Sequence, residues 1–161
     1  MNASVRLRTA NAGDIALLTR LINAAFVVER FVFDGDRVDD CGVASYLQSG
    51  KFLVAENDCG LAGCVYVEIR GDRGYVGLLS VDPQQQGTGL GRSLMDAAES
   101  YFHAAGCRAV DLRVISQRTP LPGFYRHLGY AETGTSPFAE GAHAKVPGHY
   151  IHMSKSLPRS A

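Results

Sequence analysis

The 161-residue sequence has no excess of charge and no long apolar run. Its 16 basic residues balance its 16 acidic residues. This balance argues against broad binding of nucleic acid or anionic membranes, because such binding depends on an excess of Lys and Arg. The longest stretch without a charged residue is 41–50, whereas a membrane-spanning helix needs about 20 apolar residues. We therefore expect neither a nucleic-acid partner nor a membrane span.

The chain also has few cysteines and no signal-like N-terminus. The first residues lack the apolar segment of a secretory signal, so we expect a cytoplasmic location. The four cysteines form no CxxC pair, and none has a histidine at the spacing of zinc ligands. We expect no metal site and interpret the cysteines as small apolar residues.

What is present is one domain of mixed helices and strands. No repeat or linker divides residues 1–161, and a chain of this length can bury a core without a metal or a disulfide. We therefore treat residues 1–161 as a single domain, with 155–161 as a short polar tail. Helical spacing and caps predict four helices, at 11–30, 41–48, 90–106 and 124–128.

Alternation of apolar and polar residues predicts the strands. The clearest are 5–8, 52–56, 61–70, 75–81, 109–115 and 150–153. Together with the helices they give the order βααβββαβαββ. This order predicts an α/β fold of the α+β type, in which about four helices flank a central, mixed, twisted sheet. The strand, helix and strand within 75–115 should form a right-handed parallel crossover.

The most informative segment is a glycine-rich turn between a predicted strand and a predicted helix. Gly87, Gly89 and Gly91 remove every Cβ that would keep a ligand away from the backbone. The helix that follows offers unpaired N–H groups at its N-terminus. Thr88 can serve as a helix cap or a phosphate donor, and Arg92 adds a cation within the first turn. The turn therefore predicts a pyrophosphate site.

Two common phosphate motifs do not match this turn. A dinucleotide fingerprint beginning at Gly87 would need glycine at position 92, where Arg92 stands, and it would follow the first strand of its fold. A Walker loop would need a GK[ST] sequence, which is absent. Binding of ATP or NAD by the glycine turn stays open as an alternative.

A different pair of motifs does match. Gln86, Gly89 and Gly91 fit the pattern Q/R-x-x-G-x-G/A, directly after the apolar-x-Val-x-Pro sequence of 79–83. Residues 124–130 fit the pattern F/L-Y-x-x-L-G-F/Y. In both motifs the chain resembles the GNAT superfamily of acetyl-CoA-dependent N-acetyltransferases. The predicted order of helices and strands also fits that family on both sides of the motifs.

The resemblance implies acetyl-CoA as co-substrate and a set of residues that hold it. Backbone amides of the turn and the side chain of Arg92 would bind the pyrophosphate. Main-chain groups of Leu79 and Val81 would face the thioester and the pantetheine arm, and a splay of the strands after Val81 would admit that arm. The implied coenzyme-binding residues are Leu79, Val81, Gln86, Gly87, Thr88, Gly89, Leu90, Gly91 and Arg92.

The resemblance also implies a general acid. Tyr125 stands where the family keeps the group that protonates the departing thiolate, and a phenol stays protonated at pH 7. The alternative is that Tyr125 is only a core aromatic residue. Many members carry Asn seven residues before this tyrosine, whereas this chain has Arg118. Arg118 contacts the coenzyme, orients the loop or is simply solvated, and these alternatives stay open.

The general base cannot be read from the sequence alone. Glu29, Glu68, His127 and a water relay all stay open. The implied activity is direct transfer of acetyl to a primary amine of a small molecule or peptide. A non-catalytic acyl-CoA sensor on the same fold is the alternative, because fold and coenzyme site do not prove turnover. A homodimer is a reasonable expectation from the resemblance.

An acidic segment at 29–40 bears on the acceptor. It carries five carboxylates against two arginines, and this field favours a cationic partner such as a polyamine-like compound, an amino sugar or a peptide N-terminus. Phe31 and Phe33 would supply apolar contact. The alternative is an ordinary solvated loop.

Overall fold

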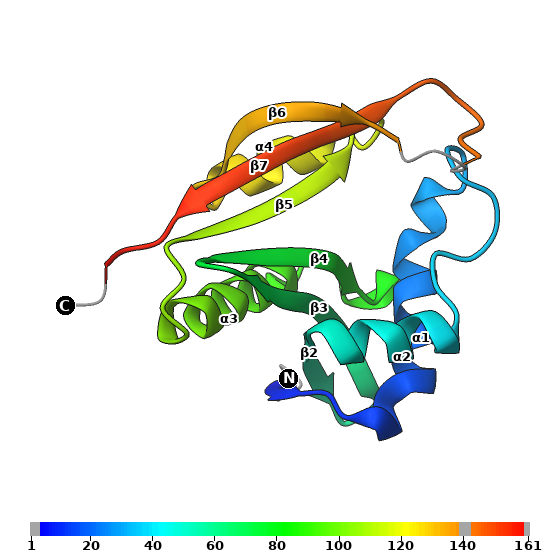
Figure 1. The fold of residues 1–161 in the computed structure, drawn as a ribbon. Helices are drawn as coiled ribbons and strands as arrows, with labels where there is room; N and C mark the ends of the chain where they lie inside the picture. The colour runs from blue at the N-terminus through cyan, green and yellow to red at the C-terminus, as the bar shows by residue number, and fades with distance from the viewer. Residues whose placement is uncertain (1–3, 139–142, 160–161) are drawn as a thin grey trace.

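One seven-stranded mixed sheet organises the chain. The computed structural model describes residues 4–138 and 143–159, and its strands lie in the order β1-β2-β3-β4-β5-β7-β6 (Figure 1). The elements are β1 (Arg6–Thr9), α1 (Ile15–Ala25), α2 (Asp40–Ser49), β2 (Lys51–Asn57), β3 (Gly60–Arg70), β4 (Arg73–Val81), α3 (Leu90–Ala104), β5 (Ala109–Ile115), α4 (Pro120–His127), β6 (Ala131–Pro137) and β7 (His149–Ser156).

This order of elements confirms the fold predicted from the sequence. β4 and β5 pair in parallel around α3, and the other neighbouring strands pair antiparallel. The first helix ends earlier than predicted, because the chain tightens into a 3-10 turn at Phe26–Glu29. The short helix α4 begins earlier than predicted, at Pro120, since proline suits the first turn of a helix.

Two apolar layers cover the two faces of the sheet. On one face, α3 and α4 pack over the middle strands through Leu94, Met95, Phe102 and Tyr125. On the other face, α1 and α2 pack over β2 and β3. A Cβ at Gly74 would lie 2.4 Å from the ring of Phe102, so glycine at this position lets α3 approach β4 closely.

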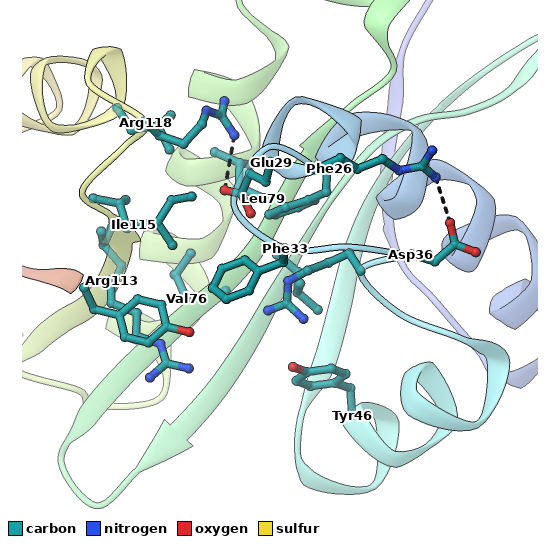
Figure 2. A pocket seen from close by; sticks show the side chains of 18 of the residues that line it. Phe26, Glu29, Phe33, Asp36, Tyr46, Val76, Leu79, Arg113, Ile115 and Arg118 are labelled. Atoms are coloured by element: carbon teal, nitrogen blue, oxygen red, sulfur yellow. Dashed lines mark hydrogen bonds and ion pairs between the residues drawn. The ribbon is translucent and has the colours of Figure 1, made fainter. Parts of the chain in front are cut away.

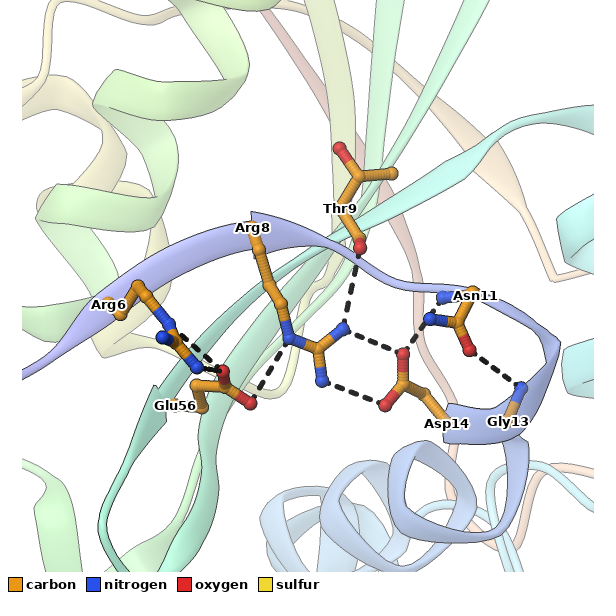
Figure 3. Close-up of polar contacts among 7 residues, drawn as sticks. All are labelled: Arg6, Arg8, Thr9, Asn11, Gly13, Asp14 and Glu56. Atoms are coloured by element: carbon orange, nitrogen blue, oxygen red, sulfur yellow. Dashed lines mark hydrogen bonds and ion pairs between the residues drawn. The ribbon is translucent and has the colours of Figure 1, made fainter.

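A network of charged side chains anchors the edge strand β1 to the start of α1 (Figure 3). The buried carboxylate of Asp14 accepts hydrogen bonds from Arg8 at 2.8 and 2.9 Å and from the backbone N–H of Asn11 at 2.8 Å. Arg8 also pairs with Glu56 of β2 at 3.1 Å. The hydrogen bonds from Arg8 hold the pKa of Asp14 below its usual range. Asp14 therefore stays ionised, and this contact holds the beginning of α1 on the sheet.

Candidate functional site

β4 and β5 separate after a short parallel ladder. They pair only where Arg73–Tyr75 faces residues 109–111. On their other sides, β5 pairs with β7 along its whole length, and β4 pairs with β3 along its whole length. A bulge bends β4 away at Leu78, the only non-glycine residue with positive φ (+51°) in the described part of the chain. The splay therefore begins after Tyr75, and the prediction that it follows Val81 was wrong.

A cavity of about 450 Å³ lies at the splay. Its walls come from the 26–37 segment, the middle of β4, the second half of β5, and α4 with the loop before it. Figure 2 shows labelled side chains from the 26–37 segment, from β4, from β5 and from the loop before α4 around a common space. The residues of its wall that bear on the chemistry are Phe26, Glu29, Phe33, Tyr46, Leu79, Arg113, Arg118 and Tyr125.

Tyr125 lies at the inner wall of this cavity. The residue is 6% exposed, and its hydroxyl forms none of the hydrogen bonds found among the described residues. Burial raises the pKa of Tyr125 above its ordinary value, and the nearby cation Arg118 only partly offsets this. The phenol therefore keeps its proton at neutral pH. Leu79 and Val81 both pack against the core under α3, but only Leu79 is also part of the cavity wall.

Of the three candidate bases, Glu29 is the one that lines the cavity. It comes from the 3-10 turn after α1, and its carboxylate lies 3.3 Å from Arg118. Burial raises the pKa of Glu29, while the charges of Arg118 and Arg37 act in the opposite direction. Glu68 accepts a hydrogen bond from the Tyr66 hydroxyl, which lowers the Glu68 pKa, and it lies outside the cavity wall.

His127 and Phe31 do not reach the cavity. His127 is exposed on α4, and Phe31 is 49% exposed. Phe33, in contrast, lines the cavity and packs edge to face against Phe138. A spacing pattern places a residue on a helix or loop but does not say toward which neighbour that loop folds.

The glycine turn has the geometry that the sequence predicts, with a different cap. Gly89 is the N-cap of α3 at φ +81°, and Gly87 has φ +80°. A Cβ at either position would meet nothing within 4 Å, so the backbone faces open space. Thr88 is not the cap, because its hydroxyl donates to the Gln85 carbonyl at 2.7 Å. As in any α-helix, the first N–H groups of α3 lack partners within the helix, and such groups are suited to bind an anion.

These features fit a molecule with a pyrophosphate and a long arm. The turn supplies backbone donors and an uncluttered surface, and the gap between β4 and β5 supplies unpaired strand edges. A Cβ at Gly91 would lie 3.6 Å from Phe124 of α4. The turn thus lies against the helix that carries Tyr125, so the two motifs are close together in space.

The acidic segment 29–40 is neutralised to a large extent by its neighbours. Three of its carboxylates form ion pairs, and a fourth, on Asp39, accepts the Gly42 N–H at 2.7 Å as the N-cap of α2. The ion pairs are Glu29 with Arg118 (3.3 Å), Asp34 with Lys145 (2.9 Å) and Asp36 with Arg30 (3.0 Å). The negative field behind the prediction of a cationic acceptor is therefore weaker than the composition indicates.

The sequence reasoning overlooked two arginines of the cavity wall. Arg113 stands on β5, where alternation already marked it as the polar member of an apolar strand. Arg37 follows the 3-10 turn and was counted only as a charge of the acidic segment. Within the described residues, no group of three or more His, Cys, Asp or Glu side chains is arranged to hold a metal ion. None of the described helices is long and apolar enough to cross a bilayer.

A family model and a curated relative both match this chain to acetyltransferases. Residues 28–147 match a family model described as an acetyltransferase (GNAT) domain. The chain is 27% identical, over 96% of its length, to a mycothiol acetyltransferase of Propionibacterium freudenreichii. The alignment covers 51% of that protein, so the chain spans about half the length of the curated relatives it matches.

Solved structures share the fold at low sequence identity. The ribosomal-protein-S18-alanine N-acetyltransferase of Escherichia coli aligns with a TM-score of 0.79 at 15% identity, over 98% of this chain and 97% of that one. Ard1 of Thermoplasma volcanium aligns with a TM-score of 0.81 at 16% identity, over 96% and 99% of the two chains. At such identities the likeness concerns the fold alone.

Proposed function

The chain belongs to the GNAT acetyltransferase family, and we propose that it transfers acetyl from acetyl-CoA directly to a primary amine of a small molecule or peptide. The observation that carries this proposal is the cavity at the splay of β4 and β5. A buried, protonated phenol and a partly buried carboxylate line the same space there. A site that only stored acyl-CoA would have no need of both groups.

Each group has a defined task in this transfer. The amine nitrogen forms a bond to the acetyl carbonyl carbon, and the bond from this carbon to the coenzyme sulfur breaks. Tyr125 donates its proton to the departing thiolate, which avoids free charge on sulfur in a buried site. Glu29 accepts the proton that the amine loses. Arg118 lies 3.3 Å from the Glu29 carboxylate, and its charge opposes the rise in the Glu29 pKa that burial causes, so it favours the ionised form that a base needs.

The proposal is tested with a panel of primary amines and acetyl-CoA. We expect release of free coenzyme A thiol in step with an N-acetylated product, measured by a thiol reagent and by mass spectrometry. Binding of acetyl-CoA without thiol release on any amine would contradict the proposal and would favour the acyl-CoA sensor. Acetylation of a hydroxyl group in place of an amine would also contradict it.

Glu29→Gln should change the pH profile of the reaction. A base acts in its deprotonated form, so kcat/KM should fall as the pH drops through the Glu29 pKa. Because burial raises this pKa, the fall should begin at higher pH than for an ordinary glutamate. We expect Glu29→Gln to remove this acidic limb and to lower kcat about tenfold, since water can take over part of the proton transfer.

The matched control for this change is Glu68→Gln. Glu68 is also a partly buried carboxylate next to an arginine, but it lies outside the cavity wall. The acidic limb should persist in Glu68→Gln when kcat/KM is measured from pH 5 to 9 (roughly the range over which a raised glutamate pKa would titrate). If the acidic limb also persisted in Glu29→Gln, the general base would be another group or a water relay.

A further inference from the structure

Charged side chains line the cavity unevenly. Four arginines line it, against three acidic residues. Each of the three carboxylates already has a cationic partner within 4 Å, and one of these partners comes from outside the cavity wall. The pairs are Arg30 with Asp36, Arg118 with Glu29, and Lys145 with Asp34. Two guanidinium groups of the wall, those of Arg37 and Arg113, are left over.

These two arginines lie over aromatic rings. The Arg113 Cζ is 4.0 Å from the centroid of Tyr150, and the Arg37 Cζ is 5.6 Å from the centroid of Phe26. In the described part of the chain, neither has a carboxylate oxygen within 4 Å. A guanidinium that lies over a ring keeps the N–H donors along its edge available, and the ring restricts its orientation. Both arginines are therefore suited to bind an anion in the plane of the guanidinium.

The arginines approach the cavity from two sides. Figure 2 shows Arg113 on the β5 side and Phe26, against which Arg37 lies, on the side of the N-terminal helices. Arg113 also lines a second cavity of about 360 Å³, which shares Tyr75 and Leu112 with the first. Glu29 faces the same space, close enough to Arg37 for the two charges to interact.

We propose that the natural acceptor is a small amine that also carries an anionic group, a carboxylate or a phosphate, which Arg37 and Arg113 bind while the amine faces Glu29. This inference rests on the proposed transferase function and names its acceptor class. Such an acceptor differs from the polyamine-like compound that the composition of 29–40 predicts. The reason is that each acidic side chain of the cavity wall has a cation within 4 Å, whereas Arg37 and Arg113 have no carboxylate oxygen within 4 Å among the described residues.

Matched pairs of amines test this inference. Each pair keeps the amine and changes only the anion: protein amino acids against their α-carboxamides, and phosphoethanolamine against ethanolamine. With the full chain and saturating acetyl-CoA, thiol release gives kcat/KM for each member. We expect the best anionic acceptor to exceed its neutral counterpart at least about tenfold. Arg113→Gln and Arg37→Gln should each bring this ratio down by about tenfold, mainly through the KM of the amine.

Further variants separate anion binding from general effects of charge or folding. Arg20→Gln removes an exposed arginine of α1 that does not line the cavity, and it should keep the wild-type ratio. Arg113→Lys retains the charge but loses the planar fork, so it should recover part of the ratio. Thermal unfolding of each variant, followed by circular dichroism, confirms that the protein compared is folded.

The possible results distinguish the two proposals. Thiol release that is equal for both members of every pair, or faster for the neutral amines, would overturn the anionic acceptor and leave amine acetylation standing. A ratio that neither arginine variant changes would also overturn it. Absence of thiol release from every amine would overturn both proposals. A rise confined to the KM of acetyl-CoA would assign the arginines to the coenzyme and overturn their role in acceptor binding.

Discussion

Tyr125→Phe is expected to lower kcat about ten- to a thousand-fold while the affinity for acetyl-CoA changes little. The hydroxyl of Tyr125 is needed only when negative charge develops on the departing sulfur, so its loss affects the transition state and not coenzyme binding. This hydroxyl forms none of the hydrogen bonds found among the described residues, so its removal should cost little stability. Steady-state kinetics with a good acceptor, together with calorimetric titration of acetyl-CoA, measures both effects.

Tyr130→Phe is the matched control. Tyr130 is 3% exposed, stacks edge to face with Tyr125 at 5.9 Å and donates its hydroxyl hydrogen to Glu99 at 3.1 Å. It does not line the cavity, so its loss should reduce stability more than kcat. An unchanged kcat in Tyr125→Phe would mean that Tyr125 is a core aromatic residue and not the acid.

Gly89→Val is expected to weaken acetyl-CoA binding by at least about tenfold, or about 1.4 kcal/mol. A Cβ at this position meets nothing in the protein and projects into the open space before the first turn of α3. A branched side chain there would keep a pyrophosphate away from the backbone N–H groups. Calorimetric titration of the folded variant with acetyl-CoA gives the change in Kd directly.

Valine at Gly89 also strains the backbone, because a positive φ is unfavourable for a branched residue. Gly106→Val introduces the same backbone strain away from the turn and therefore measures its effect alone. Gly106 has φ +85°, Gly89 has φ +81°, and neither has any heavy atom within 4 Å of its Cβ position. Gly106 lies just beyond the opposite end of α3, so valine there should cost about 1–2 kcal/mol of stability without affecting coenzyme binding. Equal acetyl-CoA affinity in Gly89→Val and the parent protein would place the pyrophosphate elsewhere. Tight binding of ATP or NAD in place of acetyl-CoA would favour the nucleotide alternative.

Much of the fold could be predicted because its signals are local. The helix predicted from residue 11 starts with a capping box of Asn11 and Asp14, and both partners of this signal lie within one turn of chain. β5 has the bounds that its alternation predicts, because every second residue must face the core. The sequence predicted that a strand precedes the last one but did not predict its residues. This strand, Ala131–Pro137, lies at the edge of the sheet and has little apolar pattern.

The candidate site was predictable only in part, for the same reason. The glycine turn and Tyr125 belong to short motifs, and the structure brings these motifs together. The choice among Glu29, Glu68 and His127 could not be made from the sequence, because it depends on which side chain faces the cavity. Glu29 meets Arg118 across 89 positions of sequence. Patterns of residue spacing cannot predict a contact between residues so far apart in the sequence.

The sequence by itself therefore determined the order of helices and strands, the conformation of the glycine turn and the position of Tyr125 on a short helix. These features depend on backbone preferences and periodicities within a few residues. Only the tertiary structure decided where β4 leaves β5, which carboxylate shares the cavity with Tyr125, and which arginines of the wall have no carboxylate within 4 Å among the described residues. A bulge at Leu78 opens the sheet after Tyr75, and partners distant in sequence neutralise the carboxylates at the cavity. Charge at the cavity depends on these long-range pairs, and composition counts charges without showing which of them are already paired.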